Sequence, residues 1–224
     1  MSLSPYDRPR FYDDALARGR HRDIVGGRWD ETGRAQMALL LDAGLKPHHH
    51  LLDIGAGSLR LGCKAVPYLD PGHYWATDAS RALMLAGHRH ELSDPARLDP
   101  AHLVEDRDFA YPGVPDDITH AIAFGVFPHL PGPALASAIA GLGRFARLEA
   151  VFFTLFLAPE GAASHRQKDG VVTHAGRAPR HVSAGHARAA APGWSLSRDD
   201  RMLPRGQVLF IARPPGRAAP GSHP

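Results

Sequence analysis

The feature that most strongly limits how this chain can fold is residues 51–60, which read LLDIGAGSLR. A short apolar strand ends here at two glycines one residue apart, and a helical pattern from Ser58 to about Leu69 follows. A strand, a glycine turn and a helix start together form the mononucleotide-binding corner of a doubly wound α/β sheet. Gly55 and Gly57 are needed there because a Cβ would block a ligand from the backbone, and because such turns often need positive φ.

The third glycine of the dinucleotide fingerprint is missing, and Arg60 stands in its place. Asp53 lies two residues before the first glycine. This order, acid-x-Gly-x-Gly at the end of a strand, resembles the first motif of the class I (Rossmann-like) S-adenosylmethionine-dependent methyltransferases. The resemblance implies a seven-stranded, mostly parallel sheet with helices on both faces and an antiparallel last strand. It also implies that Asp53, Gly55, Ala56 and Gly57 bind S-adenosylmethionine, an adenosyl ligand without a diphosphate.

A second predicted strand, residues 74–78, ends in an acid. The Asp78 carboxylate can accept hydrogen bonds from both hydroxyls of an adenosine ribose, with Ala79 beside it. The alternative is an acid at a helix N-terminus that the helix dipole stabilises, since Ser80 is a plausible cap for the helix that follows. The order of strand, glycine turn, helix, strand and acid favours ribose binding. A dehydrogenase would use the same acid, so Asp78 indicates adenosine without deciding the cofactor.

Two later loops complete the expected cofactor site. After a third strand near residues 102–104, the resemblance implies that Asp108 binds the adenine amino group and that Phe109 lies against the ring; a solvated acidic loop is the alternative. The fourth strand ends at Phe124 and Gly125. We expect this loop in the same crevice as the glycine turn, because ligands bind beyond the carboxyl ends of the strands where their order reverses.

The acceptor side of the site is expected around residues 125–131, which resemble the fourth-motif region of many small-molecule methyltransferases. His129 is the candidate general base, because imidazole titrates near neutral pH; packing at the helix start is the alternative. A sulfonium methyl group is already electrophilic, so proximity and desolvation would supply most of the rate. Aromatic rings can stabilise the sulfonium by cation–π contact, and the candidates are Tyr12, Trp29 and Phe127.

The rest of the chain divides into an N-terminal helical lid (1–46), an S-adenosylmethionine-binding domain (47–213) with a substrate-covering insertion (158–193), and a disordered tail (214–224). For the lid, a helix that merely covers the sheet edge is the alternative. The insertion has many glycines and prolines, and we predict only a short helix in it, at 183–191. Plain surface variation is the alternative there, although loops this long are usually functional or mobile.

Composition narrows the possible partners. The net charge is only +3, and no basic stripe interleaved with aromatic residues occurs, so we expect no nucleic acid. No apolar run reaches the roughly 18 residues of a membrane helix, so we expect no membrane. The single cysteine, Cys63, excludes an internal disulfide and fits a cytoplasmic protein. The 15 histidines lack the spacing and the cysteine partners of a metal site, and we assign no metal.

We therefore predict an enzyme, a monomer or homodimer, that transfers a methyl group from S-adenosylmethionine to oxygen or nitrogen of a small molecule. One alternative keeps the cofactor but has a non-methylating outcome such as cyclisation. A second is a non-catalytic S-adenosylmethionine-binding protein. A third is a nicotinamide oxidoreductase, which Arg60 disfavours.

Overall fold

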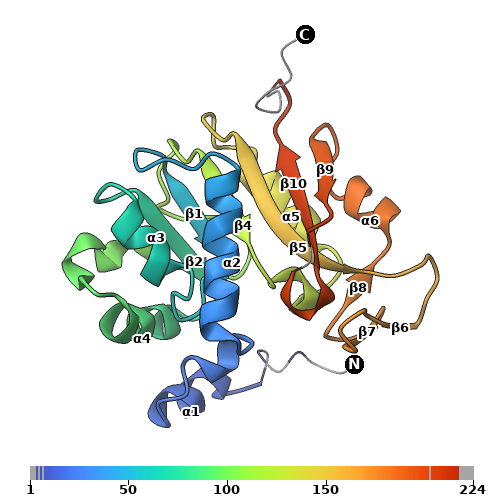
Figure 1. Cartoon of the computed structure of the whole chain (residues 1–224), viewed down its shortest axis with the longest axis horizontal. Coiled ribbons are helices and arrows are strands. Elements are labelled where there is room, and N and C mark those ends of the chain that lie inside the picture. The colour runs from blue at the N-terminus through green and yellow to red at the C-terminus, as the bar shows by residue number, and fades with distance from the viewer. Residues whose placement is uncertain (1–3, 5, 7, 202, 217–224) are drawn as a thin grey trace. The chain divides into compact units, whose positions relative to one another are not determined.

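The structure, a computed structural model, describes residues 4, 6, 8–201 and 203–216 (Figure 1). The chain divides into two compact units, Met1–Pro115 and Asp116–Pro224, called unit 1 and unit 2 below. Residues 217–224 of the predicted disordered tail lie outside the described residues. In the part of the chain that the structure describes, no helix is both long and apolar enough to cross a membrane.

Unit 1 is built on parallel strands in the order β3-β2-β1. These are β1 (Leu51–Ile54), β2 (Tyr74–Asp78) and β3 (Leu103–Glu105). Every residue of β1 is buried, as expected for a strand covered on both faces. Residues 51–54 pair with residues 74–77, so the glycine turn that follows β1 lies at the same sheet edge as the end of β2. The predicted second strand is confirmed residue for residue, and the strands predicted at about 50–55 and near 102–104 are confirmed to within one residue at each end.

The helices of unit 1 are α1 (Phe11–Ala17), α2 (Trp29–Asp42), α3 (Gly62–Tyr68) and α4 (Arg81–Glu91). Helix α1 packs against α4, and α2 against α3 (Figure 1). Ser80 caps α4 as predicted, because its Oγ accepts the Leu83 N–H at 3.2 Å. The sequence predicts that this helix stops at Gly44, and Gly44, at φ +92°, does follow the end of α2.

The helix expected from Ser58 begins later than predicted, at Gly62. Leu59 has φ +61°, a left-handed conformation that cannot continue a right-handed helix, and its side chain is fully buried. Residues 58–61 therefore form turns instead. A second correction concerns α2: the sequence favours Asp30 as its N-cap, but the helix begins at Trp29 and its N-cap is Arg28.

Unit 2 has the strand order β4-β5-β10-β9. These strands are β4 (His120–Ala123), β5 (Ala150–Leu157), β9 (Ser195–Asp199) and β10 (Val208–Arg213). Strands β4 and β5 are parallel, whereas β10 is antiparallel to both β5 and β9, which confirms the predicted antiparallel end of the sheet. Phe152 and Phe153 of β5 are fully buried and form the centre of this unit's core. The sequence pattern predicts a helix from about Pro133 to Arg147, whereas helix α5 (Ala134–Leu142) ends earlier, at Leu142.

The prediction of a strandless insertion at residues 158–193 was wrong. The structure has an antiparallel pair, β6 (Ser164–Arg166) and β7 (Val172–His174), and a short strand β8 (His181–Val182) parallel to the end of β5. The predicted helix is present as α6 (Ala184–Ala189). Strands of two or three residues are too short to produce a detectable alternation of polar and apolar residues, which is why the sequence did not reveal them.

Candidate functional site

The glycine turn of unit 1 is tied by its backbone to the end of β2. Gly55 and Gly57 have φ of +68° and +59°, the left-handed region that favours glycine. The N–H groups of Gly55 and Ala56 both donate to the Thr77 carbonyl, at 2.7 and 3.1 Å. The turn is therefore held against the neighbouring strand before any ligand is considered.

The Asp78 carboxylate links this turn to the start of α4. Its Oδ2 accepts the Gly57 N–H at 2.9 Å, and its Oδ1 accepts the Ser80 N–H at 3.0 Å. Ala79 lies between Asp78, the last residue of β2, and Ser80, the N-cap of α4. The side chain is half-buried, and burial raises its pKa while these two N–H groups oppose the rise. Each carboxylate oxygen still has a second lone-pair position, so the group can accept further hydrogen bonds from a ligand. The structure thus brings the predicted site residues Gly57 and Asp78 into direct contact, with Ala79 next to Asp78 in the chain.

Asp53 lies deeper than a ligand-contacting residue would. Its side chain is 3% exposed and accepts a hydrogen bond from the Tyr74 hydroxyl at 2.7 Å. Burial raises the pKa of Asp53 to about 7, against the opposing effects of that hydrogen bond and of the nearby Arg60 charge. The position expected to touch the cofactor is therefore a buried acid in the interior of unit 1.

The loop after β3 is organised by Asp106, which the sequence analysis missed. Its carboxylate accepts the N–H groups of Asp108, Ala110 and Tyr111, at 3.0, 3.3 and 2.8 Å. A side-chain bond to the N–H two residues on is the Asx-turn pattern that Asp favours, so a local signal was present. Asp108 is exposed on this loop, and Phe109 is half-buried at φ +60°.

Residues 21–27, which we call the cover segment, lie over the glycine turn. A Cβ placed on Gly57 would be 2.5 Å from the Val25 Cγ1, so Val25 occupies the space beside this glycine. Arg60 donates from Nη1 to the carbonyls of Val25, at 2.7 Å, and Gly27, at 3.2 Å. The residue that replaces the third glycine of the dinucleotide pattern thus anchors the cover segment.

In unit 2, the loop after β4 carries the other predicted residues. Gly125 has φ +74°, and its N–H donates to the Thr154 Oγ at 2.8 Å. Phe124 and Phe127 are buried, and the ring of Phe127 lies edge-on to Phe153 with centroids 6.0 Å apart. Phe127 is therefore a packed core residue of its unit.

His129 ends the 3-10 helix Phe127–His129 of unit 2. Burial, with a smaller contribution from the Arg205 charge, lowers the pKa of His129 to about 4. The imidazole is uncharged at neutral pH and can accept a hydrogen bond. It is nevertheless a much weaker base than an exposed histidine. The sequence did not predict this, because the lowered pKa comes from burial of the side chain.

Comparisons with known proteins were made by sequence and by structure. No family model matches the sequence, and no curated protein is detectably similar to it in sequence. Solved structures do match. Magnesium protoporphyrin IX methyltransferase (ChlM) from Synechocystis PCC 6803 with bound SAM (S-adenosylmethionine) aligns over 95% of this chain and 98% of its own, with a TM-score of 0.59 and 15% identity. This chain has the class I methyltransferase fold.

Two further structures with the class I methyltransferase fold support the same assignment. A DhpI–SAH (S-adenosylhomocysteine) complex aligns over 91% of this chain and 95% of its own, with a TM-score of 0.56 and 18% identity. A structure described as the conversion of a disulfide bond into a thioacetal group during echinomycin biosynthesis aligns over 93% of each chain, with a TM-score of 0.62 and 18% identity. At these identities the match concerns the fold.

Tyr12 and Trp29, which we predicted to contact the sulfonium group, already pack against other side chains of the protein. The Arg22 guanidinium lies 5.1 Å from the centre of the Trp29 ring system. Tyr12 packs against Phe11 and Tyr6, with ring centroids 5.4 and 6.4 Å apart. Trp29 thus has a cation partner within the protein.

Among the described residues, no group of three or more His, Cys, Asp or Glu side chains is arranged to hold a metal ion.

Proposed function

We propose that this protein is an S-adenosylmethionine-dependent methyltransferase that methylates oxygen or nitrogen of a small-molecule acceptor. The observation that carries the proposal is the hydrogen bonding of the glycine turn. The N–H groups of Gly55 and Ala56 are used by the Thr77 carbonyl, and that of Gly57 by the Asp78 carboxylate. A diphosphate needs such N–H groups as donors, whereas a nucleoside needs an acceptor for its ribose hydroxyls.

The residues of the corner fit S-adenosylmethionine chemically. Asp78 would accept hydrogen bonds from the ribose hydroxyls, and Asp108 and Phe109 would bind the adenine. The cofactor, when bound, supplies an electrophilic methyl group. The protein's own task is then to hold the acceptor in line with that methyl group and to exclude water. The SAM and SAH in two structures of the same fold support this choice of ligand.

On the acceptor side we propose His129. With its pKa lowered to about 4, His129 stays neutral and acts mainly as a hydrogen-bond acceptor that orients an acceptor O–H or N–H. Removal of a proton by His129 would be inefficient for an acceptor that arrives protonated. This favours acceptors that are already nucleophilic at neutral pH.

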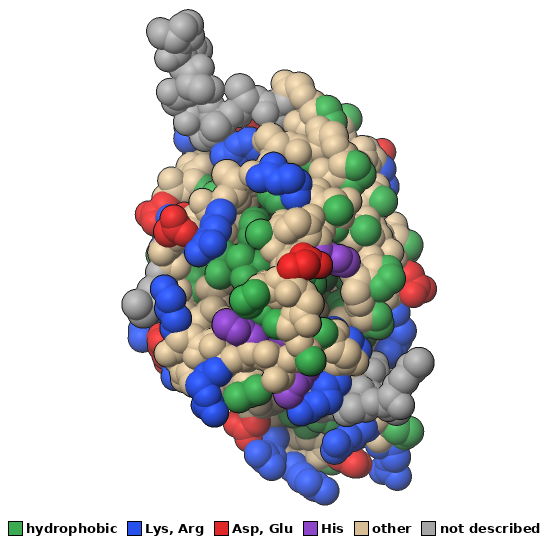
Figure 2. All heavy atoms as spheres, turned by 90° about the vertical axis from the view of Figure 1, so that its right-hand side faces the viewer, with side chains coloured by type: hydrophobic (Ala, Val, Ile, Leu, Met, Phe, Trp, Pro, Cys, Tyr) green, Lys and Arg blue, Asp and Glu red, His purple; other side chains and the backbone are tan. Residues whose placement is uncertain are grey.

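The class of acceptor is proposed on two grounds. ChlM is by its name a methyltransferase of a small molecule, a magnesium porphyrin. On the face drawn in Figure 2, Lys and Arg side chains are interspersed with acidic, histidine and hydrophobic ones, which is unlike a nucleic-acid-binding surface. A cytoplasmic location and a monomeric or homodimeric state are part of the same proposal.

A non-methylating outcome is the second candidate, because the echinomycin structure of the same fold is described by the formation of a thioacetal. Product mass spectrometry separates the two candidates: methylation adds one methyl group to the acceptor and yields S-adenosylhomocysteine. Release of methylthioadenosine from the cofactor alone would instead favour cyclisation chemistry.

The experiment that tests the proposal is titration calorimetry with S-adenosylhomocysteine and, in parallel, with NAD. We expect S-adenosylhomocysteine to bind and NAD not to bind. Binding of NAD without binding of S-adenosylhomocysteine would refute the proposal. Tight binding without turnover over a broad panel of acceptors would leave a non-catalytic binding protein.

A further inference from the structure

We propose that Glu91 is a positioning residue that holds the cover segment closed over Gly57, and thereby sets how fast an S-adenosyl ligand enters and leaves the corner. Glu91 is the last residue of α4 and acts through His21 and Arg22, at the start of the cover segment. The ligand named here rests on the proposed function. The closed position of the segment is a property of the protein alone.

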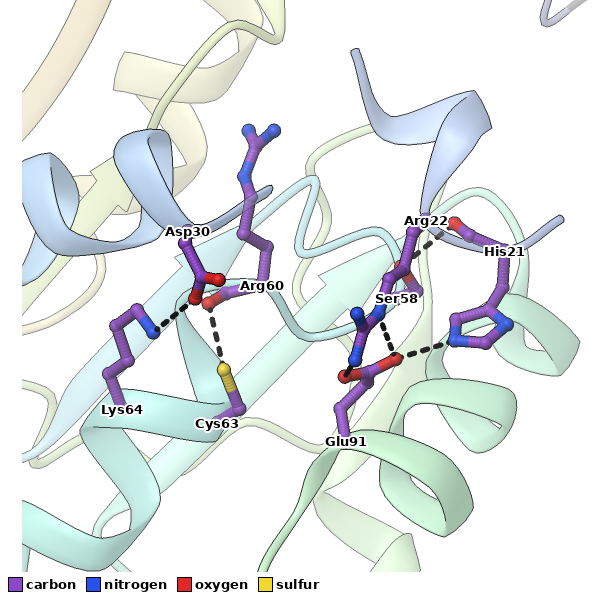
Figure 3. Close-up of polar contacts among 8 residues, drawn as sticks. All are labelled: His21, Arg22, Asp30, Ser58, Arg60, Cys63, Lys64 and Glu91. Atoms are coloured by element: carbon purple, nitrogen blue, oxygen red, sulfur yellow. Dashed lines mark hydrogen bonds and ion pairs between the residues drawn. The ribbon is translucent and has the colours of Figure 1, made fainter. Parts of the chain in front are cut away.

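Both oxygens of the Glu91 carboxylate are used in this contact (Figure 3). Oε1 accepts from the Arg22 Nε at 2.7 Å and lies 2.6 Å from the His21 Nε2, and Oε2 accepts from the Arg22 Nη2 at 2.7 Å. The carboxylate side chain is 4% exposed. Burial acts to raise the pKa of Glu91, but the hydrogen bonds from Arg22 and His21 outweigh it, so the pKa is lowered. The acid is held in its charged form by the two residues it binds.

Helix stability does not explain this acid. A negative charge at the C-terminal end of a helix interacts unfavourably with the helix dipole. The residues that interact favourably with the dipole at this end are basic, and three of them directly precede Glu91 in α4: His88, Arg89 and His90. The contact also joins residues about 70 positions apart in the sequence. The contact of Glu91 with His21 and Arg22 therefore fixes the position of the cover segment and does not stabilise α4.

Further bonds join the cover segment to the glycine turn. The Ser58 Oγ donates to the His21 carbonyl at 2.9 Å (Figure 3), and Arg60 donates to the Val25 and Gly27 carbonyls. Between these points Val25 lies against Gly57. A ligand that approaches the Gly57 backbone must pass the space that Val25 occupies.

Polar bonds and the stacking of the His21 ring on His90, with centroids 5.5 Å apart, hold the cover segment in place, with little burial of apolar side chains. Its residues 22 and 23 are exposed and the others half-buried. A cavity of about 660 Å³ lies beside it, lined by Leu16 of α1, by Arg22 and Asp23, and by Ala86 and Glu91 of α4. A segment with few buried apolar contacts opens readily once its polar bonds are broken. Gly26 and Gly27, at φ +92° and +66°, give its far end the freedom to move.

Limited trypsin digestion without ligand tests the closed position. Arg20, Arg22 and Arg28 provide cleavage sites in and beside the cover segment, and Glu91→Gln keeps all three. Because the substitution removes the charged partner of three contacts, two with Arg22 and one with His21, we expect cleavage there to be about tenfold faster. Asp116→Asn is the matched control, since it weakens another Arg–carboxylate contact, to Arg144 at 2.6 Å, outside this region; its cleavage rate there should equal that of the wild type.

Arg22→Gln is a second variant in case Glu91→Gln does not fold, because the Arg22 side chain is 55% exposed. Cleavage after Arg20 and Arg28 should again accelerate. Wild-type cleavage rates in whichever variant folds, with unfolding free energies showing that global unfolding does not contribute, would overturn the proposal.

Stopped-flow binding of S-adenosylhomocysteine tests the consequence for the ligand. We expect its dissociation rate constant to rise about tenfold in Glu91→Gln and its association rate constant not to fall. Faster cleavage with unchanged binding kinetics would overturn the gating role. Absence of any binding to the wild type would refute the proposed function and the gating role with it, whereas the trypsin comparison would still decide whether Glu91 holds the cover segment.

Discussion

The most direct test of the cofactor corner is the substitution Asp78→Asn. The Asp78 carboxylate accepts two backbone N–H groups, from Gly57 at 2.9 Å and from Ser80 at 3.0 Å. An asparagine amide has the same shape but only one oxygen. It can accept one of these N–H groups and must turn its own NH₂ donor toward the other.

The magnitude follows from the number of bonds affected. Hydrogen bonds to charged groups contribute roughly 1.5–3 kcal/mol each, and one of two is lost, so the free energy of unfolding should fall by about that amount. Ribose hydroxyls would lose a charged acceptor of the same kind. We expect the dissociation constant of S-adenosylhomocysteine to rise by roughly 10- to 100-fold, since about 1.4 kcal/mol corresponds to a factor of ten.

The assay is titration calorimetry of S-adenosylhomocysteine at one pH, together with urea unfolding. Asp94→Asn is the matched control, because the Asp94 Oδ1 also accepts a backbone N–H, from Ala96 at 3.1 Å, at an exposed turn. The control should lose a little stability and no ligand affinity. A dissociation constant for Asp78→Asn within twofold of the wild type would exclude Asp78 from the cofactor site.

Three further predictions concern buried polar groups. Because the pKa of Asp53 is raised to about 7, the folded protein keeps a proton that the unfolded chain releases above about pH 4, so this residue's contribution to stability declines as pH rises to about 7. In urea titrations, the unfolding free energy of Asp53→Asn minus that of the wild type should therefore rise by roughly 2 kcal/mol from pH 5 to pH 8. Parallel pH profiles of the two proteins would refute this. His129, with its pKa lowered to about 4, has the opposite sign: stability falls as pH drops from about 6.5 to about 4. His129→Gln should flatten that decline and reduce turnover more than cofactor affinity; equal losses of turnover and affinity would indicate a packing role. Thr154→Val removes the acceptor of the Gly125 N–H and should lower the unfolding free energy by about 1–3 kcal/mol; urea unfolding at the wild-type midpoint would contradict it.

The strands that position the corner were readable because their signals are local. Residues 74–78 are an apolar run that ends in an acid, and β2 has those bounds in the structure. The start of α3 was misjudged because the left-handed φ of Leu59 depends on burial of its side chain, which the local pattern does not encode. The role of Asp106 was missed although its Asx pattern is local.

The contacts that hold the cover segment could not be predicted, for a different reason. Its bonds run from Glu91 to Arg22 and from Arg60 to backbone carbonyls of residues more than 30 positions away. Every residue type has a backbone carbonyl, so the sequence does not show which carbonyl accepts a hydrogen bond. Only Arg60 was noticeable in the sequence, and there as a departure from the dinucleotide pattern rather than as an anchor.

That departure and the left-handed Leu59 have one joint consequence for the ligand. In a dinucleotide site the helix begins at the glycine turn, and its first N–H groups face the diphosphate. Here α3 begins only at Gly62, and the N–H groups of Cys63 and Lys64 in its first turn already donate to the carbonyls of Leu59 and Leu61. Arg60, the nearest cation in the sequence, is directed to carbonyls of the cover segment instead of toward an anion. What remains at the turn is the carboxylate of Asp78, a negative group that repels phosphate and favours a ligand with hydroxyl donors and positive charge. A sulfonium nucleoside has both properties and carries no phosphate, whereas a dinucleotide cofactor would bring its diphosphate to a turn whose residues 55–57 offer it neither free N–H groups nor a cation.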